Sequence, residues 1–136
     1  MKRFDLLNTR NIYNGRAFSV DSVEVRLPDG KRSTFDLVRH PGAVALVVVD
    51  DEQRILMVRQ YRMGADRDLL ELPAGTLNPG ELPEVCAARE VREETGFAAR
   101  DLRKLGAFYM APGYSSEYLH IFLATGLYPA RLDADE

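Results

Sequence analysis

The chain has 136 residues, enough for one domain with a hydrophobic core, and we expect a single domain over residues 1–136. Its 46% hydrophobic and 29% charged residues are ordinary for a globular protein, and a net charge of −3 without a long basic stripe argues against nucleic-acid binding. We expect neither a signal peptide nor a membrane span, because no apolar run approaches the roughly 18 residues of a span.

Most of the chain is predicted to form strands separated by turns. Runs rich in β-branched and apolar residues alternate with turn dipeptides such as Asn14-Gly15 and Pro41-Gly42. The continuous apolar run at residues 43–49 suits a strand buried on both faces. The predicted strands are residues 11–13, 18–27, 33–39, 43–49, 54–60, 69–72, 102–110 and 118–124. Residues 1–42 would therefore form a region of N-terminal strands ahead of the first core strand.

The pattern between Gly75 and Gly96 predicts a loop followed by one helix. Pro83 suits the first helical turn, and Gly96 suits the position just after the last turn. Helical spacing gives the segment an apolar face directed inward and an acidic face directed toward the preceding loop. The residues expected to face inward are Val85, Ala88, Val91 and Thr95. The carboxylates on the opposite face are Glu90, Glu93 and Glu94.

These three crowded carboxylates admit two readings. Acidic runs on helices are usually solvated surface, and like charges one turn apart cost about 0.2–0.5 kcal/mol. A divalent cation such as Mg²⁺ would turn that cost into binding energy, because hard cations prefer carboxylate oxygens. The only cysteine, Cys86, is expected to be a small packed helix residue, not a nucleophile. A single cysteine allows no intramolecular disulfide and favours a reducing, cytoplasmic compartment.

Residues 75–97 resemble the signature of the Nudix hydrolases. The signature is Gly, five residues, Glu, seven residues, Arg-Glu, an aliphatic residue, any residue, Glu-Glu, any residue, Gly and an apolar residue. The matching residues are Gly75, Glu81, Arg89, Glu90, Val91, Glu93, Glu94, Gly96 and Phe97. Family-like features extend from Phe35 to Leu127. The resemblance implies an α/β fold, an α/β/α sandwich around a mixed β-sheet with N-terminal antiparallel strands.

The resemblance also implies roles for the acidic residues. Glu90 and Glu94 would bind Mg²⁺ or Mn²⁺, helped by Glu93 and by the backbone carbonyl of Ala74. Metal ions neutralise a pyrophosphate and lower the pKa of bound water. Arg89 would orient a carboxylate through a charge-assisted hydrogen bond and would not touch substrate.

The loop at residues 109–117 resembles the ADP-ribose pyrophosphatase subgroup. Pro112 stands fifteen residues beyond Phe97, and Pro112-Gly113 resembles the Ser-Pro-Gly of that subgroup, with Ala111 in place of the serine. The resemblance implies that Pro112 and Gly113 bind substrate. Glu117 would be a general base or a further metal contact, and the alternative for it is a solvated loop acid.

Residues 58–62 resemble the same subgroup. Arg59 would contact the diphosphate or the distal ribose, because a guanidinium fork suits phosphate. Glu71 would reach a ribose hydroxyl or the metal region, whereas Arg62 is expected to be a surface charge. Glu81 would either support the site or only interact with the helix dipole.

The function that the resemblance implies is hydrolysis of ADP-ribose, or of a related nucleoside diphosphate sugar, to a nucleoside monophosphate and a sugar phosphate. A GDP-sugar or dinucleotide pyrophosphatase and a non-catalytic nucleotide-sugar sensor stay open as alternatives. In the subgroup, N-terminal strands pair across a homodimer, so residues 1–42 are expected to dimerise. The second long helix usual in the family has no counterpart before Glu136, which implies either a truncated sequence or a missing tail.

Overall fold

A computed structural model describes residues 3–130, and these residues belong to two compact units. The first unit comprises the chain up to Pro41 together with Tyr109–Tyr118, and the second comprises Gly42–Phe108 together with the chain from Leu119 onward. The expectation about a C-terminal helix falls on residues 131–136 and what would follow them, outside the described residues. None of the described helices is both long and apolar enough to cross a membrane.

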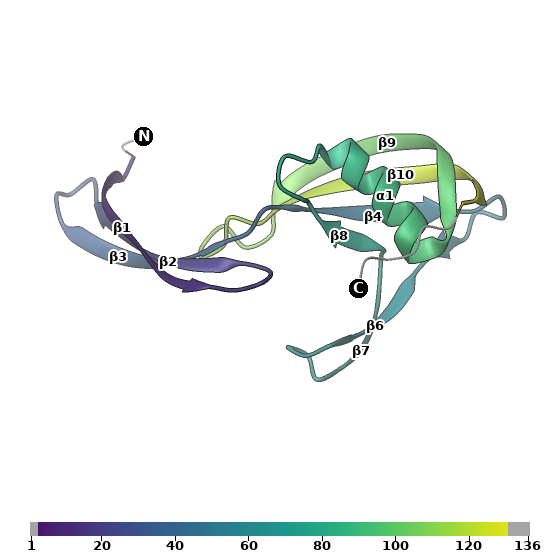
Figure 1. Ribbon diagram of the computed structural model, residues 1–136. Coiled ribbons are helices and arrows are strands. Elements are labelled where there is room, and N and C mark those ends of the chain that lie inside the picture. Colours follow the sequence, from purple (N-terminus) through teal and green to yellow (C-terminus); the bar gives the residue numbers. More distant parts are fainter. Residues whose placement is uncertain (1–2, 131–136) are drawn as a thin grey trace. The chain divides into compact units, whose positions relative to one another are not determined.

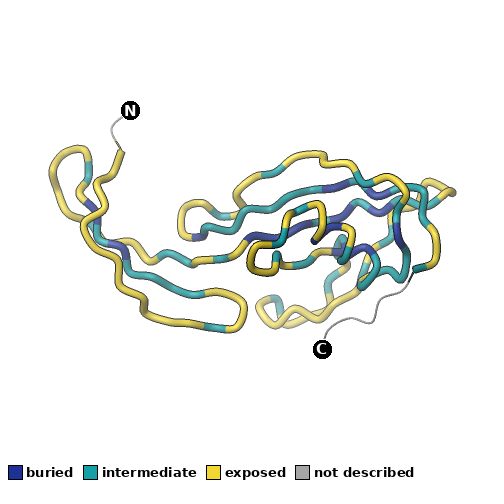
Figure 2. The backbone as a smooth tube through the Cα atoms, turned by 45° about the horizontal axis from the view of Figure 1, so that its top comes forward, coloured by how far each residue is buried: buried dark blue, intermediate teal, exposed yellow. Residues whose placement is uncertain are grey.

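The first unit contains an antiparallel sheet in the order β1 (Asp5–Asn14), β2 (Ser19–Arg26) and β3 (Arg32–Arg39). The first strand is longer than predicted, and the other two agree closely with the prediction. Every residue of β1 is exposed, while Val23 and Val25 of β2 are buried (Figure 2). The sheet thus buries few of its apolar side chains within the described chain.

The second unit contains a mixed sheet, in which β10 runs parallel to β4 and both β5 and β8 run antiparallel to β4. Over the described residues its order is β5-β4-β10-β9, with β8 also paired to β4. The bounds are β4 (Ala43–Val49), β5 (Ile55–Leu56), β8 (Ala74–Thr76), β9 (Phe97–Tyr109) and β10 (Tyr118–Pro129). The predicted α/β class with a mixed sheet and N-terminal antiparallel strands is confirmed.

Two expectations about strands in this unit are wrong. The predicted strand at residues 54–60 is interrupted at Met57, because β5 pairs with β4 whereas β6 (Val58–Arg62) pairs with β7 (Arg67–Glu71). Figure 1 shows β6 and β7 leaving the sheet as a separate hairpin. Gly75 and Thr76, expected to begin a loop, belong to β8 (Ala74–Thr76), because their backbone pairs with β4.

The helix α1 (Pro83–Thr95) has the predicted ends. Pro83 lies in its first turn, and Gly96 has a φ of 75° while its N–H donates to the Arg92 carbonyl at 3.0 Å. The left-handed conformation at Gly96 is one that glycine adopts without a steric penalty. The helix packs against β4 and β8 (Figure 1). The core that joins helix and sheet consists of Val44, Leu46, Val48, Cys86, Ala87, Val91, Phe122 and Ala124.

The predicted inward face of the helix is wrong at two positions. Val85 is 55% exposed and Ala88 is also exposed, whereas the buried helix residues are Cys86, Ala87, Glu90 and Val91. The buried side of the helix therefore includes a carboxylate, that of Glu90. The physical reason is that the Glu90 carboxylate accepts a hydrogen bond from the Arg89 guanidinium and fits into the space left by the missing side chain of Gly75. The spacing of apolar residues cannot predict either contact.

Candidate functional site

One guanidinium gathers the carboxylates of the helix and of the loop before it. Arg89 donates from Nε and Nη2 to the two oxygens of Glu81, at 3.0 and 2.9 Å. Its Nη1 donates to Glu90 Oε1 at 2.6 Å and to Glu93 Oε2 at 2.9 Å. A planar guanidinium suits several charge-assisted bonds at once. These hydrogen bonds orient the carboxylates, and a role of Arg89 in the reaction stays a prediction.

Glu81 ties the loop to the helix. Its Oε2 accepts the backbone N–H of Asn78 at 2.9 Å as well as the bond from Arg89. The hydrogen bonds from Arg89 are the main reason that the pKa of Glu81 falls to about 2. Glu81 therefore stays ionised at neutral pH, and its contacts go beyond an interaction with the helix dipole.

Glu90 lies directly over Gly75. Its side chain is buried, and a Cβ atom added to Gly75 would overlap Glu90 Cδ and Oε1. Burial is the main cause that raises the pKa of Glu90, the charges of Glu93 and Glu94 raise it further, and Arg89 opposes this shift. The signature glycine therefore has a steric reason here, because any side chain in its place would displace the carboxylate.

Glu94 differs from its neighbours because it is exposed and, in the part of the chain that the structure describes, its carboxylate forms no hydrogen bond or ion pair. Its charge helps to raise the pKa of Arg62, although the hydrogen bonds from Arg62 to Glu71 are the larger cause. Arg62 Nε donates to the two oxygens of Glu71 at 2.9 and 3.0 Å. Arg62, expected to be only a surface charge, therefore forms an ion pair and lies within electrostatic reach of Glu94.

The strand register separates the two arginines of the hairpin. Arg59 pairs with Leu70 and Arg62 pairs with Arg67, so the register fixes which residues share a face. Side chains three positions apart in a strand point to opposite faces. Arg62 and Glu71 share one face of the hairpin, and Arg59 is on the other face. The role expected of Arg59 stays a prediction, and what sequence reasoning missed is the ion pair of Arg62 with Glu71.

The carboxylates fit a hard divalent cation by their chemistry, because carboxylate oxygens are the ligands it prefers. Burial first, and then the charges of Glu93 and Glu94, raise the pKa of Glu90, and a cation would relieve the repulsion between these charges. Ala74 lies in β8 immediately before Gly75, and Gly75 is the residue next to the Glu90 carboxylate. Within residues 3–130, however, no three His, Cys, Asp or Glu side chains are arranged to hold a metal ion. Glu90 and Glu93 point instead to Arg89.

Cys86 is buried beside this cluster. Its Sγ lies 3.4 Å from Arg89 Nη2 and 3.7 Å from the Thr76 carbonyl oxygen. Burial is the main cause that raises the pKa of the thiol to about 12. The thiol is therefore protonated at neutral pH, which agrees with a small packed residue and not with a nucleophile.

The remaining predicted site residues belong to the first unit. Pro112 and Gly113 are exposed in a turn in which the N–H groups of Tyr114 and Ser115 donate to the Ala111 carbonyl at 3.1 and 2.8 Å. Glu117 is half-buried, and its N–H donates to Ser115 Oγ at 3.1 Å. The roles of these residues stay predictions, since the carboxylates around Arg89 belong to the other unit.

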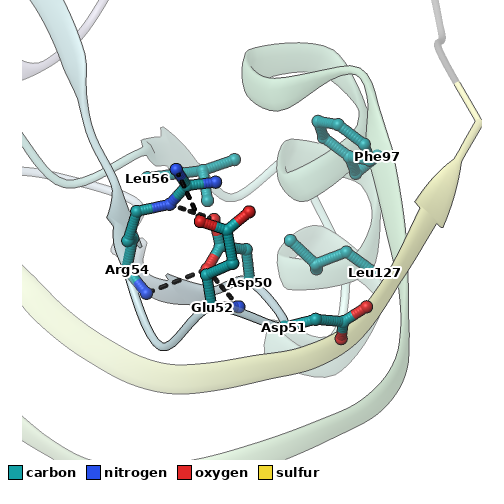
Figure 3. A pocket seen from close by; sticks show the side chains of 7 residues that line it. All are labelled: Asp50, Asp51, Glu52, Arg54, Leu56, Phe97 and Leu127. Atoms are coloured by element: carbon teal, nitrogen blue, oxygen red, sulfur yellow. Dashed lines mark hydrogen bonds and ion pairs between the residues drawn. The ribbon is translucent and has the colours of Figure 1, made fainter.

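A cavity of about 440 Å³ in the second unit lies elsewhere (Figure 3). It is lined by Asp50, Asp51, Glu52, Arg54, Leu56, Phe97 and Leu127. Arg54 pairs with Asp50 at 2.8 Å and with Glu52 at 3.0 Å, so part of its acidic rim is already neutralised. None of the predicted catalytic, metal or substrate residues lines this cavity, and it does not mark the candidate site.

Comparison with known proteins gives close relatives. An ADP-ribose pyrophosphatase of Bacillus subtilis is 47% identical over 116 residues, which are 85% of this chain and 63% of that protein. A methanol dehydrogenase activator of Bacillus methanolicus is 40% identical over 134 residues, 96% of this chain and 72% of that protein. A crystal structure of an ADP compounds hydrolase is also similar, with a TM-score of 0.87 and 32% sequence identity. The match covers 100% of this chain and 74% of the hydrolase chain.

These matches cover most of this chain but only part of each relative. The chain spans less than two thirds of the Bacillus subtilis protein, which is matched over 63% of its length. A sequence profile of the NUDIX domain matches residues 38–136, which include the whole signature around Arg89. The profile, the relatives and the shared fold together show that this chain belongs to the Nudix family.

Proposed function

We propose that this protein hydrolyses the pyrophosphate bond of ADP-ribose, or of a related nucleoside diphosphate sugar, with Mg²⁺ or Mn²⁺. The products would be AMP, or another nucleoside monophosphate, and a sugar phosphate. The observation that carries the proposal is the cluster in which Arg89 holds Glu90 and Glu93 while Glu90 lies over Gly75. The names of the Bacillus subtilis relative and of the similar crystal structure support ADP compounds as substrates.

The proposed roles follow from charge and position. Glu90 and Glu94, with the carbonyl of Ala74, would hold the cation, and Glu93 would assist. When bound, the cation would neutralise phosphate charge and supply a bound water of lowered pKa. Arg89 keeps the Glu90 and Glu93 carboxylates in fixed orientations. Glu117 would accept a proton from the attacking water.

The substrate contacts proposed from the resemblance are Arg59, Glu71, Pro112 and Gly113. For the diphosphate we favour Arg62 over Arg59. The two arginines lie on opposite faces of the hairpin, and it is Arg62 whose pKa is raised by Glu71 and, to a smaller extent, by the charge of Glu94. Losing a charge-assisted hydrogen bond costs roughly 1.5–3 kcal/mol. We therefore expect Arg62→Ala to raise KM by about tenfold or more, and Arg59→Ala to change it less. Steady-state kinetics on the two variants decides between them, and a larger effect at Arg59 would restore the assignment from resemblance.

The metal-dependent reaction is tested with a panel of ADP-ribose, GDP-sugars and dinucleotides, with and without Mg²⁺, with products identified by mass. Glu94→Gln should lower turnover by about 100-fold, the upper range for weakened metal sites, without unfolding the protein. Glu84→Gln, at an exposed glutamate in the first turn of the same helix, is the matched control. Wild-type turnover by Glu94→Gln would refute the metal assignment. Binding without turnover across the panel would favour the sensor.

We further propose that residues 1–136 act as one domain and that residues 1–42 pair in a homodimer. The exposed apolar side chains of the first sheet, Leu6 at 67% and Ile12 at 53% exposure, support the dimer. Sedimentation that shows only monomer at micromolar concentration would contradict it. The single cysteine supports a cytoplasmic location.

A further inference from the structure

The last turn of α1 is hydrogen-bonded to Ala130, the residue just after β10 (Tyr118–Pro129), through both backbone polar groups of that one residue. Arg92 Nε donates to the Ala130 carbonyl at 3.0 Å. The Ala130 N–H donates in turn to the Gly96 carbonyl at 3.1 Å. Arg92 and Gly96 are one helical turn apart, and the Gly96 N–H bonds to the Arg92 carbonyl at 3.0 Å. Ala130 therefore spans the terminal turn from outside the helix.

This turn carries the carboxylate with the least support of its own. Arg89 holds the Glu93 carboxylate, but no hydrogen bond or ion pair within residues 3–130 holds the Glu94 carboxylate. The position of the Glu94 carboxylate therefore depends on the backbone of the turn. Helix ends fray because their last carbonyls lack intrahelical partners. A link from this turn to another strand would limit that fraying.

Local contacts close the same turn but do not anchor it. Thr95 Oγ1 donates to the Val91 carbonyl at 2.5 Å and accepts the Phe97 N–H at 3.2 Å. Both bonds join residues within six positions of one another, so they would move with the turn. The bond from Arg92 spans 38 residues and is half-buried, and it can therefore hold the turn against the sheet.

We propose that Arg92 is a positioning residue for the metal site: by fastening the terminal turn to Ala130, it holds Glu94 where the cation binds. This inference rests on the proposed function. The signature assigns nothing to Arg92, which occupies a position where any residue is allowed. A simpler role, a positive charge that interacts with the helix C-terminus, would stabilise the helix without any effect on the placement of Glu94.

The test measures Mn²⁺ binding to the full chain, from the electron paramagnetic resonance signal of free Mn²⁺, without substrate. Arg92→Ala should weaken binding by about tenfold, the size expected when a group that orients a metal ligand is lost. Amide hydrogen exchange without metal should become faster at residues 93–96. Arg103→Ala removes an exposed arginine from β9 and should change neither quantity. If Arg92→Ala fails to fold, Arg92→Gln replaces it, because it loses the charge but keeps a donor, and it should weaken binding less than tenfold.

The possible results are separable. Binding by Arg92→Ala within about twofold of the wild type would overturn the inference while leaving the proposed function intact. Weaker binding without faster exchange at residues 93–96 would also overturn it, because Arg92 would then act by charge alone. A wild-type protein that binds no Mn²⁺ and turns over no substrate would overturn the proposed function together with the inference.

Discussion

Replacing Glu90 with glutamine is expected to abolish metal-dependent turnover and yet leave the protein as stable as before, or more stable. Burial, and then the charges of Glu93 and Glu94, raise the pKa of Glu90 above its usual value. A carboxyl whose pKa is raised by folding binds its proton more tightly in the folded state. Its ionised form therefore lowers the free energy of unfolding at neutral pH, and the penalty disappears as pH falls below the pKa of the unfolded state.

Glutamine resembles the protonated carboxyl, and its carbonyl can still accept the bond from Arg89. In the absence of divalent cations we expect the free energy of unfolding of Glu90→Gln to equal that of the wild type or to exceed it by up to about 1 kcal/mol. Turnover should fall by at least about 100-fold, because a neutral amide is a poor ligand for a hard cation. The same carboxylate would then serve the reaction at a cost to the fold.

Urea denaturation with a chelator present, together with turnover in Mg²⁺, measures both effects of Glu90→Gln. The stability difference from the wild type should shrink as pH falls, since Glu90 then becomes protonated in the folded protein. Glu84→Gln should leave turnover unchanged and should lower stability only by the roughly 0.3–1 kcal/mol that a first-turn carboxylate gains from the helix dipole. A loss of several kcal/mol in Glu90→Gln would mean instead that the ionised Glu90 holds the fold together through Arg89.

The ends of the helix could be predicted from the sequence because they depend on local signals. Pro83 and Gly96 act on their own backbone, so the predicted start and stop agree with α1. The buried face could not be predicted in the same way. Which side of the helix is buried depends on Gly75, which lies on the strand β8, and on the Arg89 guanidinium, which also binds Glu81. The spacing of apolar residues cannot predict that a charged side chain is buried when it has a hydrogen-bond partner.

The hairpin shows a second limit of the same kind. Alternation predicts which side chains share a face of a strand only when the strand and its partner are known. The sequence around Met57 reads as one continuous strand and does not show that the pairing partner changes there from β4 to β7. Arg59 and Arg62 could therefore not be assigned to faces of the hairpin. The pair of Arg62 and Glu71 is separated by nine residues and a turn, beyond the reach of spacing rules.

Substituting Gly75 with alanine is expected to remove activity as completely as Glu90→Gln, but also to destabilise the protein. The added Cβ would occupy the place of the Glu90 carboxylate, which is buried and bonded to Arg89 at 2.6 Å. The carboxylate must then leave its site or strain the neighbouring strand. Overpacking and the loss of a buried charged hydrogen bond each cost about 1–3 kcal/mol, so we expect a destabilisation of about that size.

Glu90→Gln and Gly75→Ala together show whether activity is lost because the Glu90 carboxylate is displaced or because its charge is removed. Gly106→Ala is the matched control, because Gly106 lies in an exposed part of β9 and an added Cβ meets no atom within 4 Å. Removing the Glu90 side chain as well, in Gly75→Ala/Glu90→Ala, should return part of the lost stability and none of the activity, since the new methyl group then has room. Urea denaturation and turnover in Mg²⁺ read out all three proteins. Gly75→Ala with wild-type turnover would show that the carboxylate of Glu90 does not need its place over β8 for the reaction.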